Sequence, residues 1–374
     1  MDVGLVASET PSKVENPQSK ITLMEAGAQA GIELCGTTLR YAEAEAYGPK
    51  RSGRPGRPRA ESGHRLLRLG SCDFDFDVAR VLWGTGGAAS SESFDRQVAT
   101  LGEALADVYE QTTAEELRVV VHPSQAPSFF APAPAGASKA DRRARFRREA
   151  RLLTRAAGMP APETAAPEAP FAADAPDDLH VDARKLRAGS EADGQDSWFR
   201  VLALDEATHA RFQQVMERVP MPSFRWVAST EASAQGAAVL QRRREEGAST
   251  EDAASTEDAA TLAVGCYPGH LELALVRGKA LRHALHAPGA TPADGAYFAA
   301  ALLDRLGIAP SAVEDVFAYG LDVGAPEDAF APLGRLTGTT PQLLDIRPIL
   351  GLDPDRLAED FDAGPYVPCV AAAL

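Results

Sequence analysis

Two segments that lie far apart in this chain, residues 31–44 and 262–279, each have the pattern of a β-hairpin. In both, an apolar strand leads into small and turn-forming residues and then returns as a strand of alternating hydrophobicity. This pattern is typical of two antiparallel strands joined by a tight turn. Because one hairpin opens each half of the chain, the pattern predicts a duplicated fold with two lobes and a cleft between them.

The rest of the sequence indicates an α/β fold. After each hairpin, strands alternate with amphipathic helices, which is typical of a mixed sheet covered by helices. Apolar residues at spacings of three and four predict helices, and short β-branched or alternating runs predict strands. The predicted helices span residues 94–109, 141–157, 205–219, 230–244, 294–306 and 326–337, with a short one after Tyr366, and further strands span residues 65–73, 117–121, 198–204, 224–228, 280–285, 313–319 and 341–345.

Shifts in composition divide the chain into four parts. A Pro-, Ala- and Arg-rich stretch interrupts the first half, and the sequence Ala-Ser-Thr-Glu-Asp-Ala occurs twice, starting at Ala248 and at Ala254. Exposed loops tolerate such duplications because added loop length costs little. The predicted parts are a disordered tail (1–25), a first lobe (26–246) with an inserted subdomain at about 126–197, a linker that carries the repeat (247–260) and a second lobe (261–374).

The composition argues against several classes of protein. Of the 374 residues, 45% are hydrophobic, as in a globular protein, and no apolar run reaches the length of a membrane-spanning helix. The net charge of −15 disfavours binding to nucleic acid. The four cysteines form no Cys-x-x-Cys pair, which disfavours both a disulfide framework and a zinc site. His283 and His286 lack a nearby third His or Cys that would complete a zinc set.

Six segments follow one another in a distinctive order: Gly31-Ile-Glu-Leu-Cys-Gly-Thr-Thr, Ala144-Arg-Phe-Arg-Arg-Glu-Ala-Arg-Leu-Leu, Phe199-Arg-Val-Leu-Ala, residues 212–219, Phe224-Arg-Trp-Val-Ala-Ser-Thr-Glu-Ala and Gly364-Pro-Tyr-Val-Pro-Cys-Val-Ala-Ala-Ala-Leu. This order resembles the actin-like superfamily of sugar kinases, heat-shock chaperones and actin, and within it the PilM family of type IV pilus machines. The cytoplasmic part of the secretion protein GspL is a related case. The resemblance implies an actin-like, ribonuclease H-like fold of two duplicated lobes with a small inserted subdomain.

The resemblance also implies a nucleotide site, because in this superfamily the hairpin turns hold phosphates and an Asp holds Mg²⁺. Glu33 replaces the Asp of the first hairpin, and Gly265 and Tyr267 stand at the Asp and Gly positions of the second. A single glycine follows Tyr319 where the family has two. We therefore interpret the site as degenerate, with ATP and Mg²⁺ bound weakly or not at all and no catalytic residue or metal ligand assigned. The candidate nucleotide-binding residues are Glu33, Gly36, Thr37, Thr38, Gly265 and Gly320.

Two segments are strongly basic. From Ser52 to Arg59 the chain has two Gly-Arg-Pro units, which fit either an AT-hook in a DNA minor groove or a solvated hairpin tip. The helix from Arg142 to Arg155 has seven arginines, and its apolar contacts are expected to be Phe146, Leu152 and Leu153. This helix fits either a solvated face or attachment to anionic lipid or an acidic partner.

The resemblance leads to one hypothesis for the function. The chain is expected to be a cytoplasmic, actin-like scaffold of a type IV pilus or related secretion machine, peripheral to the inner membrane. It would dock the cytoplasmic tail of an inner-membrane protein such as PilN in a groove near residues 129–153. The alternative is an active ATPase or small-molecule kinase of the same superfamily. The sequence leaves the partner and the oligomeric state open.

Overall fold

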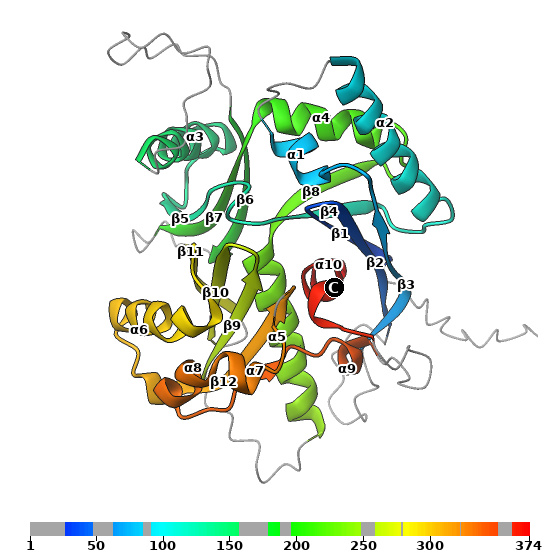
Figure 1. Cartoon of the computed structure of the whole chain (residues 1–374). Helices are drawn as coiled ribbons and strands as arrows, with labels where there is room; N and C mark the ends of the chain where they lie inside the picture. Colours follow the sequence, from blue (N-terminus) through cyan, green and yellow to red (C-terminus); the bar gives the residue numbers. More distant parts are fainter. Residues whose placement is uncertain are drawn as a thin grey trace, which may run out of the picture.

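The computed structural model describes residues 27–47, 63–84, 91–156, 179–187, 196–247, 259–277, 280–321, 323–350 and 361–374. The described residues contain two five-stranded sheets, one in each half of the chain, and a smaller three-stranded sheet (Figure 1). The predicted tail, most of the predicted linker and the Gly-Arg-Pro units lie outside the described residues. No helix among the described residues is long and apolar enough to cross a membrane.

The sheet of the first lobe has the strand order β3-β2-β1-β4-β8. The predicted first hairpin is confirmed, because β1 and β2 pair in antiparallel register from Gln29 opposite Ala44 to Cys35 opposite Thr38. Strands β4 and β8 continue the sheet in parallel. Helices α1, α2 and α4 pack on one face of this sheet in a single hydrophobic core. The elements are β1 (Gln29–Cys35), β2 (Thr38–Tyr47), β3 (Gly63–Asp73), α1 (Val78–Trp83), α2 (Ser91–Val108), β4 (Glu116–Val121), α4 (Glu206–Met216) and β8 (Ser223–Ala228).

The second lobe repeats this plan with the strand order β11-β10-β9-β12-β13. Its hairpin turns at Gly269, and its outer face is covered by α6, α7 and α8. The single helix predicted over residues 326–337 is wrong, because the chain forms two helices that meet at Phe330. The elements are β9 (Ala260–Tyr267), β10 (His270–Arg277), β11 (Ala280–Pro288), α6 (Gly295–Leu306), β12 (Val313–Gly320), α7 (Pro326–Ala329), α8 (Ala331–Thr337), β13 (Gln342–Leu343) and α9 (Arg347–Leu350), with 3₁₀ turns at Pro292–Asp294, Pro310–Ala312 and Gly364–Tyr366.

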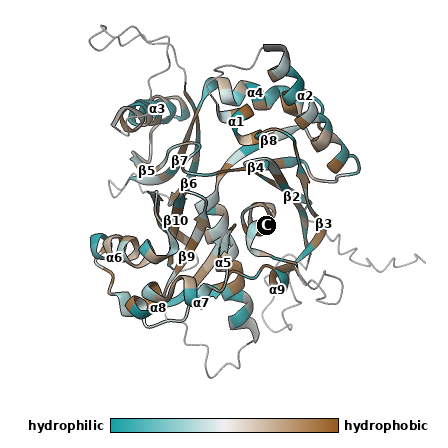
Figure 2. Cartoon of the chain, in the orientation of Figure 1, coloured by the Kyte–Doolittle hydropathy of each residue, from teal (hydrophilic) through white to brown (hydrophobic). Residues whose placement is uncertain are grey.

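A small subdomain projects from the first lobe, within the predicted insertion and just after it. Its antiparallel sheet has the order β5-β7-β6, and α3 packs on it through Phe146 and Ala150. The expectation that Leu152 and Leu153 also pack inward is wrong, because both side chains are exposed. Helix α3 is largely hydrophilic on its surface (Figure 2). The elements are β5 (Ser128–Ala133), α3 (Lys139–Ala156), β6 (Leu179–Arg187) and β7 (Ser197–Asp205).

Two helices lie between the large sheets and join the lobes: α5 (Ser229–Gly247) and α10 (Val367–Ala373) (Figure 1). Small residues of the two helices lie against one another, among them Ala232 and Gly236 of α5 and Ala371 of α10, which lets the helices approach closely. All residues of α10 are buried. Helix α5, which was predicted to begin at Thr230, begins one residue earlier, at Ser229. Gly31 on β1 leaves room for α10, because a Cβ atom there would collide with the carbonyl oxygen of Cys369.

Candidate functional site

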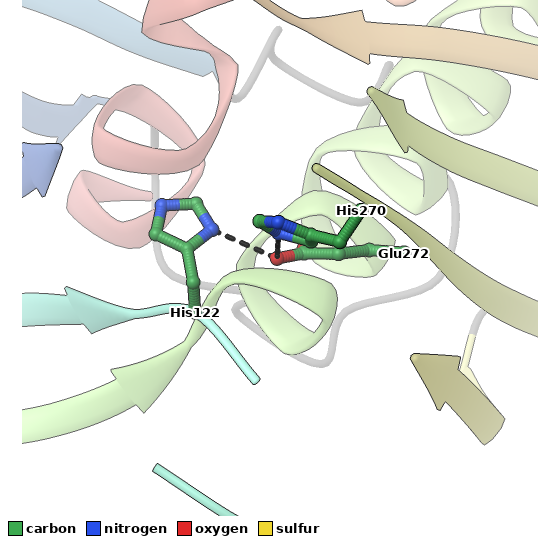
Figure 3. A group of neighbouring side chains, drawn as sticks. All are labelled: His122, His270 and Glu272. Carbon is green, nitrogen blue, oxygen red and sulfur yellow. Dashed lines mark hydrogen bonds and ion pairs between the residues drawn. The ribbon is translucent and has the colours of Figure 1, made fainter. Parts of the chain in front are cut away.

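A buried histidine, His122, joins the two lobes. It directly follows β4, and its ring lies between Glu33 on β1 of the first lobe and Glu272 on β10 of the second. Nε2 of His122 is 2.9 Å from Oε1 of Glu33, and Nδ1 is 2.8 Å from Oε1 of Glu272 (Figure 3 shows the Glu272 side). The side chains of both glutamates are fully buried. One imidazole therefore links a carboxylate from each predicted hairpin.

Further hydrogen bonds hold the two carboxylates in place. The Tyr267 hydroxyl donates to Oε1 of Glu33 over 3.2 Å. Glu272 accepts from the hydroxyls of Ser229, at 2.5 Å, and Tyr319, at 3.3 Å, and its other oxygen lies 3.2 Å from Nε2 of His270. These groups come from β9, α5, β12 and β10, so the network ties the helix between the sheets to both hairpins.

Two opposing effects, burial and the attraction between opposite charges, set the pKa values of His122 and Glu272. Burial alone would lower the pKa of His122, but the charge and hydrogen bond of Glu272 and those of Glu33 outweigh it and raise this pKa to about 10. Burial would raise the pKa of Glu272, but the charged ring of His122 and the hydrogen bonds from His122, His270 and Ser229 hold it well below its usual range. His122 therefore keeps its proton at neutral pH and carries a positive charge between the two glutamates.

A second buried charge, Arg200 on β7, connects the small subdomain to α5. Its guanidinium lies 3.3 Å from Glu231, and it donates to Thr230 over 2.9 Å and to Ser128 over 3.2 Å. Only 2% of the Arg200 side chain is exposed. Burial lowers the pKa of Arg200, and the charge of Glu231 opposes this effect. The subdomain is thus attached to the central helix by a hydrogen-bonded ion pair.

Comparison with solved structures identifies the fold. No family model and no curated protein matches the sequence. A structure of the PilM–PilN type IV pilus biogenesis complex matches 92% of this chain and 97% of its own, with a TM-score of 0.54 and 12% identity. The chain has an actin-like fold. The predicted fold and, at the level of the fold, the predicted resemblance to the PilM family are confirmed.

Two other solved structures are similar at lower scores. A Bacteroides thetaiotaomicron protein with an actin-like ATPase fold and unknown function matches 89% of this chain and 99% of its own, with a TM-score of 0.44 and 10% identity. The cytoplasmic domain of EpsL, an inner-membrane component of the type II secretion system of Vibrio cholerae, matches 79% of this chain and 82% of its own, with a TM-score of 0.37 and 9% identity.

The structure places the predicted nucleotide-binding residues on β1, β2, β9 and β12 and in the turn between β1 and β2. In the first hairpin, Gly36 has a φ of 59° at the turn, and both Gly36 and Thr37 are exposed. The Thr38 hydroxyl donates to Asp73 over 2.8 Å. In the second lobe, Gly265 is buried in β9, and Gly320 ends β12 with a φ of 113°. Their role in nucleotide binding stays a prediction.

The residues between the hairpins do not fit a nucleotide with its Mg²⁺ in the arrangement observed. Glu33, the carboxylate that would face the metal, is fully buried and bonded to His122. In front of Gly265 the space is filled by Tyr319, whose ring would lie 2.6 Å from a Cβ atom at that glycine. The ring of Tyr267 packs against His122 with 4.4 Å between centroids. We therefore derive no reaction step through a bound nucleotide.

The sequence did not reveal three members of the network: His122, His270 and Glu272. A signal was present for two of them. Glu272 is an acid among the buried apolar residues 271–276 of β10, and burying an acid is costly unless its charge is paired. His122 stands at the carboxyl end of a parallel strand, where α/β folds commonly place functional groups. For His270, next to the second turn, the sequence offers no comparable signal.

Proposed function

We propose that this chain is an actin-like scaffold of a type IV pilus or related secretion machine, which holds the cytoplasmic tail of an inner-membrane protein without using a nucleotide. The observation that carries the proposal is the match in fold to the PilM–PilN complex over almost the whole of both chains. Because it covers 92% of this chain, the match extends over both lobes and into the small subdomain.

The network around His122 supports a scaffold rather than an ATPase. Phosphoryl transfer depends on a positioned metal ion and on groups that stabilise the charge of the transferred phosphate. Here Glu33 and Glu272, the carboxylates that the two hairpins carry nearest to their turns in the sequence, are buried and bonded to the protein's own imidazole. A permanent link through His122 would then hold the two lobes together without a bound nucleotide.

The small subdomain has the surface expected of a docking site. Among the described residues it carries four of the seven exposed large hydrophobic side chains: Leu152, Leu153, Leu186 and Trp198. Leu186 and Trp198 occupy neighbouring positions on the paired strands β6 and β7, and 42% of Trp198 is exposed. Large apolar side chains exposed together mark interaction sites, and Trp is enriched where partners bind. We place the tail of the partner on this subdomain.

Helix α3 supports a position against the inner membrane. Its buried residues Phe146 and Ala150 face the subdomain, while Arg143 and Arg148 are exposed. Such a basic helix face is attracted to anionic lipid, and salt weakens this attraction. Co-sedimentation with anionic vesicles at low and high salt tests this placement, and an absence of binding at low salt would exclude it.

Binding of synthetic tails tests the scaffold directly. Peptides with the cytoplasmic N-terminal sequences of inner-membrane pilus and secretion proteins are titrated into the full-length chain, and binding is followed by fluorescence anisotropy. We expect one class of tail to bind and Trp198→Ala to weaken it at least about tenfold, or 1.4 kcal/mol. The matched control is Tyr297→Ala, because Tyr297 is 72% exposed on α6, far from the subdomain in the chain, and should bind as the wild type does. If no tail binds, the proposal is wrong.

Calorimetry with ATP and Mg²⁺ distinguishes the scaffold from the alternative, an active enzyme of the same superfamily. The scaffold proposal expects no heat of binding. A clear micromolar affinity that Glu33→Ala weakens would instead support an active ATPase or small-molecule kinase.

A further inference from the structure

Three side chains in the network between the lobes direct ligand atoms toward one point. Oε1 of Glu272 lies 2.8 Å from Nδ1 of His122 and 3.2 Å from Nε2 of His270, and all three atoms lie within 4.8 Å of one another (Figure 3). The three residues are buried. They belong to β10 of the second lobe and to the loop after β4 of the first, so the cluster spans both lobes.

This donor set has the chemistry and the spacing of a zinc site. Zn²⁺ binds imidazole nitrogen and carboxylate oxygen at about 2.0–2.2 Å in a tetrahedral arrangement, which places neighbouring ligand atoms about 3.3 Å apart. The two distances from Glu272 are already close to this value. Two histidines and one glutamate also match a ligand combination that zinc proteins use.

The surroundings of the cluster match those of a metal site as well. Ligating histidines commonly use their second ring nitrogen to bond a carboxylate, which fixes the orientation of the ring. Nε2 of His122 makes this bond to Glu33. The Ser229 hydroxyl donates to the free oxygen of Glu272, as partners of ligating carboxylates do.

A third imidazole lies beside the cluster. His286 on β11 is directly opposite Glu272 in the register of β10 and β11, and its ring is 5.2 Å from that of His270. Its Nε2 atom is buried and, among the described residues, has no hydrogen-bond partner. This nitrogen is a candidate for a fourth ligand.

We propose that His122, His270 and Glu272 bind one divalent transition-metal ion, of which Zn²⁺ is the best fit, and that the ion joins the two lobes. The ion takes the position of the proton between Nδ1 of His122 and Glu272, and this proton is released. Access is from the side of the second hairpin turn, where 11% of the His270 side chain is exposed. The inference concerns the protein's own stability and does not depend on the proposed partner.

The proposal is tested by measuring the bound metal and the thermal stability of the full-length protein. The chain is treated with a chelator, dialysed against Zn²⁺ and analysed by mass spectrometry for bound metal, with thermal unfolding recorded before and after. We expect one Zn²⁺ per chain and a higher melting temperature, because a ligand that binds only the folded state stabilises it. Co²⁺ as a probe should give the visible absorption of a site with nitrogen and oxygen ligands.

Variants identify the ligands. His270→Gln should lower the affinity for Zn²⁺ at least about tenfold, and Glu33→Gln by about 10–100-fold, because Glu33 orients His122 without touching the ion. His283→Gln is the matched control, since His283 is a partly buried histidine on the same strand as His286, packed beside Phe130 away from the cluster. Circular dichroism shows whether each variant is folded. A wild type that retains far less than one equivalent of metal, or a folded His270→Gln that binds as the wild type does, would overturn the proposal.

Discussion

Gly320 ends β12 in a backbone conformation that disfavours every other residue. Its φ is 113°, and a Cβ atom would collide with the carbonyl oxygen of Cys266 on the neighbouring strand. We expect Gly320→Ala to lower the free energy of unfolding by about 2–5 kcal/mol, the sum of a strained backbone and an overpacked contact.

The control for this change is Gly289→Ala, measured by urea denaturation under the same conditions. Gly289 also has a positive φ, 71°, but no heavy atom lies within 4 Å of the position of its Cβ. This variant should therefore lose only the backbone component, about 1 kcal/mol. Equal losses in the two variants would contradict the steric explanation. The same result bears on the predicted role of Gly320, because a structural need for glycine explains its presence without a nucleotide.

At the scale of residues, the sequence predicts Glu33 but not its partners. Glu33 stands in a short local pattern, whereas its bond to His122 joins positions that are 89 residues apart. The bond from His122 to Glu272 joins positions 150 residues apart. Such contacts depend on how the two sheets are placed, which no local periodicity encodes. The acid within β10 indicates that a partner must exist, but it does not identify that partner.

At the scale of elements, the prediction of α3 is nearly right and the prediction of its neighbours is incomplete. The helix was expected over residues 141–157 and is found at Lys139–Ala156, because helix periodicity is a local property. Strands β5 and β6 were not predicted. Their sequences, SFFAPA and LHVDARKLR, contain proline or many charges, and they form strands because each pairs with β7. Strand formation depends on such cross-strand contacts more than on composition.

The contact between β6 and α4 is expected to weaken in acid. His180 on β6 stacks on His209 of α4, with ring centroids 3.6 Å apart. Burial, the charge of His209, and the charges of Arg143 and Arg147 on α3 lower the pKa of His180 to about 4, and burial also lowers that of His209. In the unfolded chain both histidines titrate near 6.5.

The sign of this effect follows from proton binding. Between pH 6.5 and about 4, the unfolded chain binds protons that the folded histidines do not, so the free energy of unfolding falls as the pH falls through this range. We expect His180→Gln to make this decline shallower. Urea denaturation of both proteins at several pH values down to about 5, above the range of most carboxylates, measures it. The prediction fails if the two pH profiles have the same slope.

At the scale of the whole molecule, the duplicated hairpins predicted two lobes, and the structure contains them. The helices that join the lobes were predicted only as helices, because a run rich in alanine does not reveal whether it lies on a surface or between two sheets. Helix α10 shows this most clearly, since every residue from Val367 to Ala373 is buried. The link between the lobes therefore has an apolar part, α5 with α10, and a charged part at His122.

Removing only His122 from the charged part should lower the free energy of unfolding strongly. Removing His122 together with both of its glutamate partners should lower it much less. In His122→Leu, Glu33 and Glu272 stay buried and lose the cation between them, and breaking a buried ion pair in this way costs about 3–5 kcal/mol. Replacing the whole group by neutral side chains, in His122→Leu with Glu33→Gln and Glu272→Gln, removes both buried carboxylates. Arg40, which lies 3.8 Å from Glu33, also loses its partner, but 12% of its side chain is exposed and stays in contact with water. We expect the triple variant to be more stable than His122→Leu, although it lacks two more native residues.

Urea denaturation of metal-free protein in the presence of a chelator measures this order, so that bound metal does not contribute. Unfolding should follow a single transition in the wild type, because the lobes share a core through α5 and α10. If His122 links the lobes mainly by charge, restoring neutrality recovers stability even though hydrogen bonds have been lost. If His122 acts mainly by filling space, the triple variant will be the least stable of the three proteins. In that case the fold brings the charged residues together, and their ion pairs do not hold the lobes closed.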